Sequence, residues 1–127
     1  MSDEAAAVAD EALRLSTDAA RIVLESGGET YRAEDVMKAV AASLGGLDPD
    51  SFATPTGFIA SCDDSTGHSR AVVKRIRRRQ MNLCKIARVN ELARSVVRGT
   101  VDRDSLEREL CAIDTLGQYP EIGRAHV

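Results

Sequence analysis

Large aromatic side chains are almost absent from this chain. Its 127 residues contain no tryptophan, and aromatic residues make up only 3% of the total, whereas apolar residues reach 43%. The core must therefore be built from Ala, Val, Leu and Ile, which is typical of closely packed helices. A chain of this length and composition is expected to fold as one domain with a single core.

Long apolar runs and a strong excess of one charge are also lacking. No segment has the ~18 to 20 consecutive apolar residues that a membrane-spanning helix needs. The opening M-S-D-E-A-A-A-V is acidic where a secretion signal would be basic and then apolar. A net charge of −3 argues against a protein that covers nucleic acid with its whole surface. We predict a soluble segment without a secretion signal.

Cysteine is rare, and the three cysteines are far apart, with neither C-x-x-C nor zinc-ligand spacing. Reduced, partly buried thiols of a cytoplasmic protein are expected. His68 lies beside Asp63 and Asp64, but one histidine and two acids in a polar loop make a poor ligand set, so no metal is expected. The cysteines are Cys62, Cys84 and Cys111.

Four segments have the three-to-four-residue apolar period of a helix face. Glycine follows each of them, as is common at helix C-termini. The first two predicted helices are residues 4–26 and residues 30–44, and Thr30 is predicted to cap the second. The third has one face formed by Leu83, Ile86, Ala87, Asn90, Ala93 and Val97. The fourth is capped by Asp102 and buries Leu106, Leu110 and Ile113. Asn90 is predicted to be a buried amide bonded to backbone.

The middle of the chain has a different composition. Residues 47–50 are typical of a turn, and residues 51–62 are rich in β-branched and aromatic residues, which predicts a strand. Pro55 and Gly57 would interrupt it, so it is an edge strand or carries a bulge. Residues 70–77 can return as a second strand. The predicted fold class is α+β, with two helix pairs packed on a short antiparallel β-hairpin.

Three motifs, in order along the chain, resemble the threonine/serine exporter family. The first, residues 27–37, reads G-G-E-T-Y-R-A-E-D-V-M and is similar to the family signature G-A-E-T-Y-R-V-E-D-T-M, with departures at Gly28, Ala33 and Val36. The others are T-P-T-G at residues 54–57 and N-L…V-N at residues 82–90. The resemblance covers residues 11–120.

The resemblance implies a role in transport that the composition does not show. It identifies residues 1–120 as a cytoplasmic N-terminal domain of an exporter in the bacterial cell membrane, followed by membrane-spanning helices that move threonine and serine, or dicarboxylates in relatives. The partners it implies are membrane-spanning helices of the same or a partner subunit and a small amino acid or organic acid. Residues 122–127 match a translated sequencing-library adapter, so residues 121–127 are predicted to be an adapter-derived tail.

Two of these motifs supply candidate substrate-binding residues. Carboxylates, a phenol and a guanidinium at a helix N-terminus can hold an amino-acid ligand, and hydroxyls beside a strand irregularity can face one. Helix capping, an Arg32 salt bridge and a proline-protected edge strand are the structural alternatives. The candidates are Glu29, Tyr31, Arg32, Glu34, Thr54 and Thr56.

One basic run has three interpretations. A solvated strand end is the commonest, and contact with anionic lipid headgroups comes next, because each basic residue gains ~1 kcal/mol there. Nucleic-acid binding is disfavoured because no aromatic residues lie between the charges. The basic residues are Lys74, Arg75, Arg77, Arg78 and Arg79.

No catalytic motif or cofactor-binding motif is present. The sequence contains neither a nucleophile elbow nor a phosphate-binding glycine loop. A hydrolase would have to use Glu29 or Glu34 as general base and Thr54 or Thr56 as nucleophile. Catalytic residues and cofactors are therefore not predicted, and a cytoplasmic hydrolase and a partner-subunit interaction module are kept as alternatives.

Overall fold

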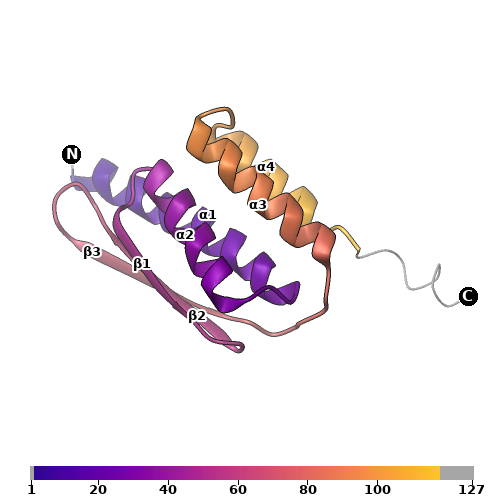
Figure 1. The fold of residues 1–127 in the computed structure, drawn as a ribbon. Helices are drawn as coiled ribbons and strands as arrows, with labels where there is room; N and C mark the ends of the chain where they lie inside the picture. The colour runs from indigo at the N-terminus through magenta and orange to yellow at the C-terminus, as the bar shows by residue number, and fades with distance from the viewer. Residues whose placement is uncertain (1, 118–127) are drawn as a thin grey trace, which may run out of the picture.

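The computed structural model describes residues 2–117, which form three layers (Figure 1). A three-stranded antiparallel sheet packs on one helix pair, and the second helix pair packs on the far side of the first. The α+β class is confirmed. The elements are α1 (Ser2–Glu25), α2 (Thr30–Ser43), β1 (Leu47–Ala53), β2 (Gly57–Asp63), β3 (Ser69–Arg75), α3 (Leu83–Arg98) and α4 (Arg103–Asp114).

The sheet has one strand more than the predicted hairpin. Residues 47–50, predicted as a turn, begin β1, and the predicted strand at residues 51–62 is split by a turn at residues 54–57. Pro55 and Gly57 favour that turn over a bulge. Pro49 is tolerated because β1 is an edge strand, where a missing N–H breaks no central ladder.

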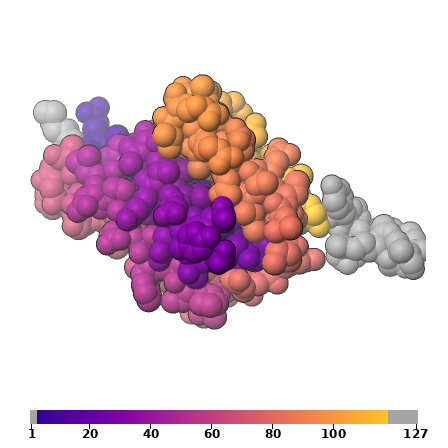
Figure 2. Space-filling model, viewed as in Figure 1, coloured from indigo at the N-terminus to yellow at the C-terminus, as the bar shows by residue number. Residues whose placement is uncertain are grey.

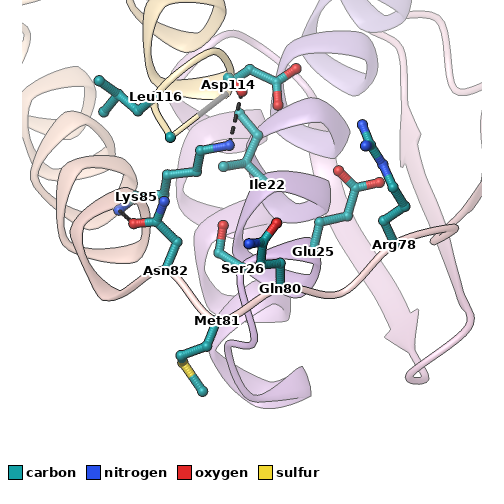
Figure 3. A pocket seen from close by; sticks show the side chains of 11 residues that line it. Ile22, Glu25, Ser26, Arg78, Gln80, Met81, Asn82, Lys85, Asp114 and Leu116 are labelled. Atoms are coloured by element: carbon teal, nitrogen blue, oxygen red, sulfur yellow. Dashed lines mark hydrogen bonds between the residues drawn. The ribbon is translucent and has the colours of Figure 1, made fainter. Parts of the chain in front are cut away.

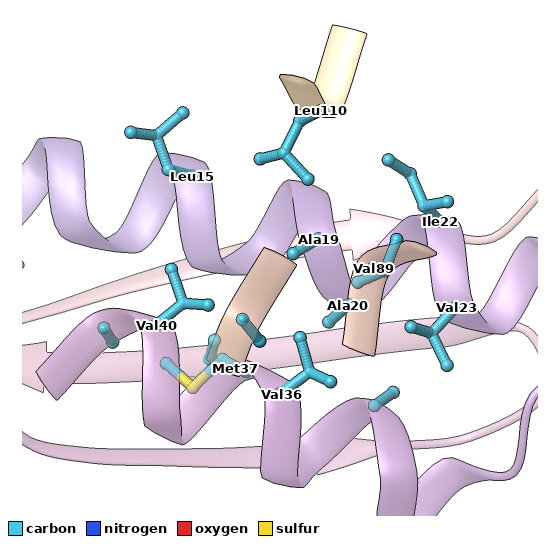
Figure 4. Close-up of a cluster of buried hydrophobic side chains, with 14 of the residues drawn as sticks. Leu15, Ala19, Ala20, Ile22, Val23, Val36, Met37, Val40, Val89 and Leu110 are labelled. Atoms are coloured by element: carbon cyan, nitrogen blue, oxygen red, sulfur yellow. The ribbon is translucent and has the colours of Figure 1, made fainter. Parts of the chain in front are cut away.

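The layer order also differs from the prediction, because only one helix pair lies on the sheet. Helix α1 occupies the centre, with α2 and the sheet on one side and α3 and α4 on the other. Its buried side chains therefore extend around most of the helix. Figure 4 shows the resulting core, which joins Leu15, Ala19, Ala20, Ile22 and Val23 of α1 to Val36, Met37 and Val40 of α2, Val89 of α3 and Leu110 of α4.

Helix ends follow local chemistry in most places. Asp102 caps α4 by accepting a hydrogen bond from the backbone N–H of Ser105, as predicted, and Gly99 ends α3 in the left-handed conformation with φ 79°. The predicted cap at Thr30 is wrong, because Thr30 is already helical and Glu29 occupies the cap position without a side-chain cap bond.

Gly28 shows why this chain departs from the signature it resembles. A Cβ atom at Gly28 would lie 2.5 Å from Val23 Cγ1 and 2.8 Å from the Val23 carbonyl oxygen. The alanine of the signature would therefore force the end of α1 to move. The preceding Gly27 has φ 88°, the left-handed conformation expected just after a helix.

The buried face of α3 is rotated relative to the predicted one. Leu83 and Val97 are exposed, and Asn90 is half-buried outside the core. The prediction used the apolar spacing alone, whereas contact with α1, α2 and α4 from one side selects a neighbouring face. The residues it buries are Val89, Leu92, Ala93 and Val96.

None of the helices in residues 2–117 combines the length and apolar character that a membrane crossing requires. The predicted adapter-derived tail at residues 121–127 lies outside the described residues.

Candidate functional site

The candidate residues separate onto opposite sides of α2. On the sheet side, Glu34 Oε2 accepts a hydrogen bond from the backbone N–H of Ala53 across 2.9 Å. The Thr54 hydroxyl donates to the Gly57 carbonyl at 3.2 Å and accepts from the Gly57 N–H at 3.0 Å, which closes the β1–β2 turn. Thr56 is exposed, and its carbonyl accepts from the N–H of Ile76. Glu34 therefore holds β1 to α2, Thr54 closes the turn, and the Thr56 carbonyl holds that turn to the residue after β3.

This arrangement does not assemble the hydrolase pair. Glu34 and Thr54 each have a separate backbone partner, and no hydrogen bond joins either glutamate candidate to either threonine within residues 2–117. A nucleophile and its base need mutual hydrogen-bond reach. The described part of the chain also has no group of three or more His, Cys, Asp or Glu side chains able to hold a metal.

The other candidates lie on the opposite side of α2. The Arg32 guanidinium carbon is 5.8 Å from the centre of the Tyr31 ring, and the Tyr31 hydroxyl donates to Glu29 Oε1 at 3.2 Å. Arg32 forms no ion pair with any residue in the range 2–117, so the predicted salt bridge is not formed there.

A groove of about 460 Å³ separates α2 from α3 next to these residues. Figure 2 shows the surface on which α2, in purple, meets α3, in orange. The α2 wall carries both charges, and the α3 wall adds an amide and two guanidinium groups. The lining residues are Tyr31, Arg32, Asp35, Val36, Ala39, Asn90, Ala93, Arg94, Val97 and Arg98.

The arginines on the two walls of the groove differ in their ion pairs. On the α3 wall, Arg94 and Arg98 both contact the carboxylate of Glu91, at 2.9 and 3.4 Å. On the α2 wall, the aromatic contact with Tyr31 is the only interaction of the Arg32 guanidinium within residues 2–117. Arg32 is therefore the cation with most capacity for an added carboxylate, and Asp35 on the next turn supplies a negative charge for an ammonium group.

The sequence prediction omitted Asp35, Asn90 and Arg94 from the site. Asp35 lies in the first motif next to the candidate Glu34, and Asn90 was predicted to be a buried amide bonded to backbone. The signal that points to them is the spacing of Asn90 and Arg94, which are four residues apart and so share one face of α3. Asn90 and Arg94 interrupt the apolar stripe of α3, and the neighbouring helix α2 carries charges of both signs at Arg32 and Asp35.

A second, smaller cavity of about 110 Å³ lies at the C-terminal end of α1 (Figure 3). Lys85 Nζ donates to the Asp114 carbonyl oxygen at 2.9 Å. The backbone N–H groups of Gln80 and Asn82 donate to the carbonyls of Glu25 and Ser26. These bonds tie the segment before α3 to α1, and the space holds only a few water molecules at ~30 Å³ each. We assign this cavity a structural role.

Comparison with known proteins defines the class as a family of small-solute transporters. Residues 14–126 match the family described as "Putative threonine/serine exporter". The match covers most of the chain, and the chain belongs to the threonine/serine exporter family. No curated protein and no solved structure matches it.

Proposed function

We propose that this chain is the N-terminal, cytoplasmic domain of an exporter of threonine and serine, or of related small organic acids, in the bacterial cell membrane. Membership of the family supports the transport role. A conducting path needs membrane-spanning segments, which the same or a partner subunit would supply. In this arrangement the domain binds the solute at the α2–α3 groove.

The observation that carries the proposal is the state of Arg32. A half-buried guanidinium without an ion pair in residues 2–117 faces a groove, and its charge is available for a bidentate bond to a carboxylate. Asp35 can receive the ammonium group of the same amino acid. Ala39 and Ala93 leave room for a short side chain, and the Asn90 amide can bond to its hydroxyl.

Solute binding can be tested by NMR titration of the ¹⁵N-labelled chain with L-threonine and L-serine. We expect amide shifts concentrated at residues 31–35 and 90–94. Arg32→Gln should weaken binding by about tenfold or more, because a charge-assisted pair contributes ~1.5–3 kcal/mol. Arg103→Gln, on α4 away from the groove, is the matched control and should leave affinity unchanged. Equal affinity of the Arg32→Gln variant and the parent chain would refute the groove assignment.

The exporter assignment has a separate test at the DNA level. The genomic sequence downstream of codon 120 should encode several apolar segments of ~20 residues each. A stop codon shortly after that position would contradict an exporter domain and favour a free-standing interaction module. In cells that carry the full gene, Arg32→Gln should lower threonine efflux at equal expression.

A further inference from the structure

No helix of residues 2–117 covers the outer face of the sheet (Figure 1), and this face carries a row of exposed apolar residues. Phe52 pairs with Ile59 across β1 and β2, and Ile59 pairs with Val73 across β2 and β3, so the three side chains lie side by side on one face. Their exposed fractions are 64%, 47% and 72%. Isolated exposed apolar residues are ordinary, but a contiguous row across all three strands indicates a contact surface.

Positive charge lies where β3 ends, starting beside this row. Arg75 is the next outward-facing residue of β3 after Val73, and its strand partner is Gly57. Ile76 is buried, and Arg77 and Arg79 beyond it are exposed. Within residues 2–117 none of these three arginines forms an ion pair.

The rest of the basic run is placed differently. Lys74 alternates with Val73 and Arg75, so it is half-buried on the side of the sheet that faces the helices. Arg78 lines the small cavity at the end of α1. The structure therefore divides the five basic residues. Arg75 lies on the outer face next to Val73, and Arg77 and Arg79 are exposed in the segment that follows the end of β3.

We propose that this face docks on an anionic phospholipid surface. Phe52, Ile59 and Val73 would contact the boundary between headgroups and acyl chains, and the three arginines would contact lipid phosphates. An apolar row followed by cations at the end of β3 matches a surface that is negatively charged outside and apolar beneath. Asp50 and Asp63 lie toward the opposite end of the face, so the basic end would sit nearer the lipid. This inference goes beyond solute binding and does not depend on it.

Vesicle co-sedimentation of the 127-residue chain tests this docking. We expect binding to vesicles of phosphatidylcholine with phosphatidylglycerol, weaker binding to phosphatidylcholine alone, and release by salt. The Arg75→Gln/Arg77→Gln/Arg79→Gln variant should bind on the order of a hundredfold more weakly, at about fivefold per charge. Arg88→Gln/Arg103→Gln/Arg108→Gln removes the same charge from α3 and α4 and should bind like the parent chain. Equal loss in both triple variants would overturn the proposal.

A fluorescence probe separates docking through the apolar row from simple charge attraction. The chain has no tryptophan, so Phe52→Trp introduces a single fluorophore in the row. Its emission should shift to the blue on anionic vesicles and be quenched by lipids brominated near the headgroup. Unchanged emission while the chain co-sediments would overturn insertion of the row. Self-association in sedimentation velocity that Phe52→Thr/Val73→Thr abolishes, without vesicle binding, would assign the face to a second copy instead.

Discussion

The carboxylate of Glu34 in α2 accepts a hydrogen bond from the backbone N–H of Ala53, the last residue of β1, across 2.9 Å. This bond joins the first of the three sequence motifs to the residue immediately before the second. It also fixes where β1 ends, because the turn at residues 54–57 begins at the next residue. Glu34 is thus placed to stabilise the contact between the sheet and the helix layer.

Replacing Glu34 should destabilise the fold. Glu34→Ala removes a charged acceptor from a half-buried N–H, and we expect a loss of about 1–2 kcal/mol in the free energy of unfolding. Glu34→Gln keeps an acceptor oxygen and should lose less. Urea unfolding followed by circular dichroism measures both. Glu29→Ala is the control. Within the described residues this exposed carboxylate bonds only to Tyr31, so its loss should change stability by less than about 0.5 kcal/mol. Equal losses at Glu29 and Glu34 would contradict this role.

Arg21 should contribute more than a typical surface ion pair. Its guanidinium binds Asp18 at 2.7 Å, Glu25 at 2.7 Å and Asp114 at 2.8 Å, and its side chain is only 16% exposed. Arg21→Met would leave three carboxylates close together without a cation. We expect a loss of about 2 kcal/mol, below the full value for a buried pair because the carboxylates are partly solvated.

Arg14 provides the matched control for Arg21. It also bridges α1 to α4, through Glu107 at 2.9 Å, but its side chain is 52% exposed. Arg14→Met should therefore cost less than about 1 kcal/mol in urea unfolding. If the two variants lost the same stability, burial would not be what gives the Arg21 cluster its strength.

The separation of the candidate residues onto two sides of α2 follows from helix geometry. Arg32 and Glu34 are two positions apart, which turns their side chains by roughly 200° around the axis. They could not face one ligand from the same helix, and this could have been predicted. The sequence could not predict that the Arg32 side chain faces α3, because this depends on how the two helix pairs stack.

The parts of the fold that depend on local sequence signals were predictable. The parts that depend on strand pairing and on the packing of layers were not. Helical periodicity and terminal glycines located all four helices of residues 2–117. β1 was missed because Asp48 and Pro49 have low strand propensity, and this strand forms through its pairing with β2. The layer order was missed because a single apolar stripe was assigned to α1, formed by Val8, Ala12, Leu15, Ala19, Ile22 and Val23. Leu13 and Leu24, outside that stripe, are also buried and are the residues that mark a central helix.

Asp64 should make stability depend on pH in the acid range. Its buried carboxylate accepts from the Thr66 hydroxyl at 2.6 Å and from the backbone N–H groups of Thr66 and His68. These bonds hold the pKa of Asp64 below its ordinary value of 3.8, and the bond from the Thr66 hydroxyl has the largest effect. A lowered folded-state pKa gives stability that is present above pH ~4 and is lost as pH falls through the folded pKa.

Asp64→Asn isolates this charge, because all three bonds go to Oδ1, which the amide retains. The variant should be less stable than the parent chain at neutral pH, and the difference should shrink below pH ~4. Urea midpoints across this range give the comparison. A difference that stayed constant down to strongly acidic pH would show that the carboxylate charge is not responsible.

The three cysteines should react in two classes. Cys84 and Cys111 are exposed, whereas Cys62 of β2 is buried against α1, with its thiol 3.8 Å from the Ala9 carbonyl oxygen. Burial, and then the negative charge of Asp63, raises the pKa of the Cys62 thiol, so both its thiolate fraction and its access are reduced.

Titration with a thiol-reactive chromophore should give two fast equivalents in the native chain and three in urea. The Cys62→Ala variant should keep both fast equivalents, whereas Cys84→Ala should lose one of them. A native Cys62→Ala variant with a single fast thiol would place a different cysteine in the core. Because Cys62 lies between the sheet and α1, its slow reaction reports the opening of that interface, and Glu34→Ala should accelerate it if Glu34 holds the two layers together.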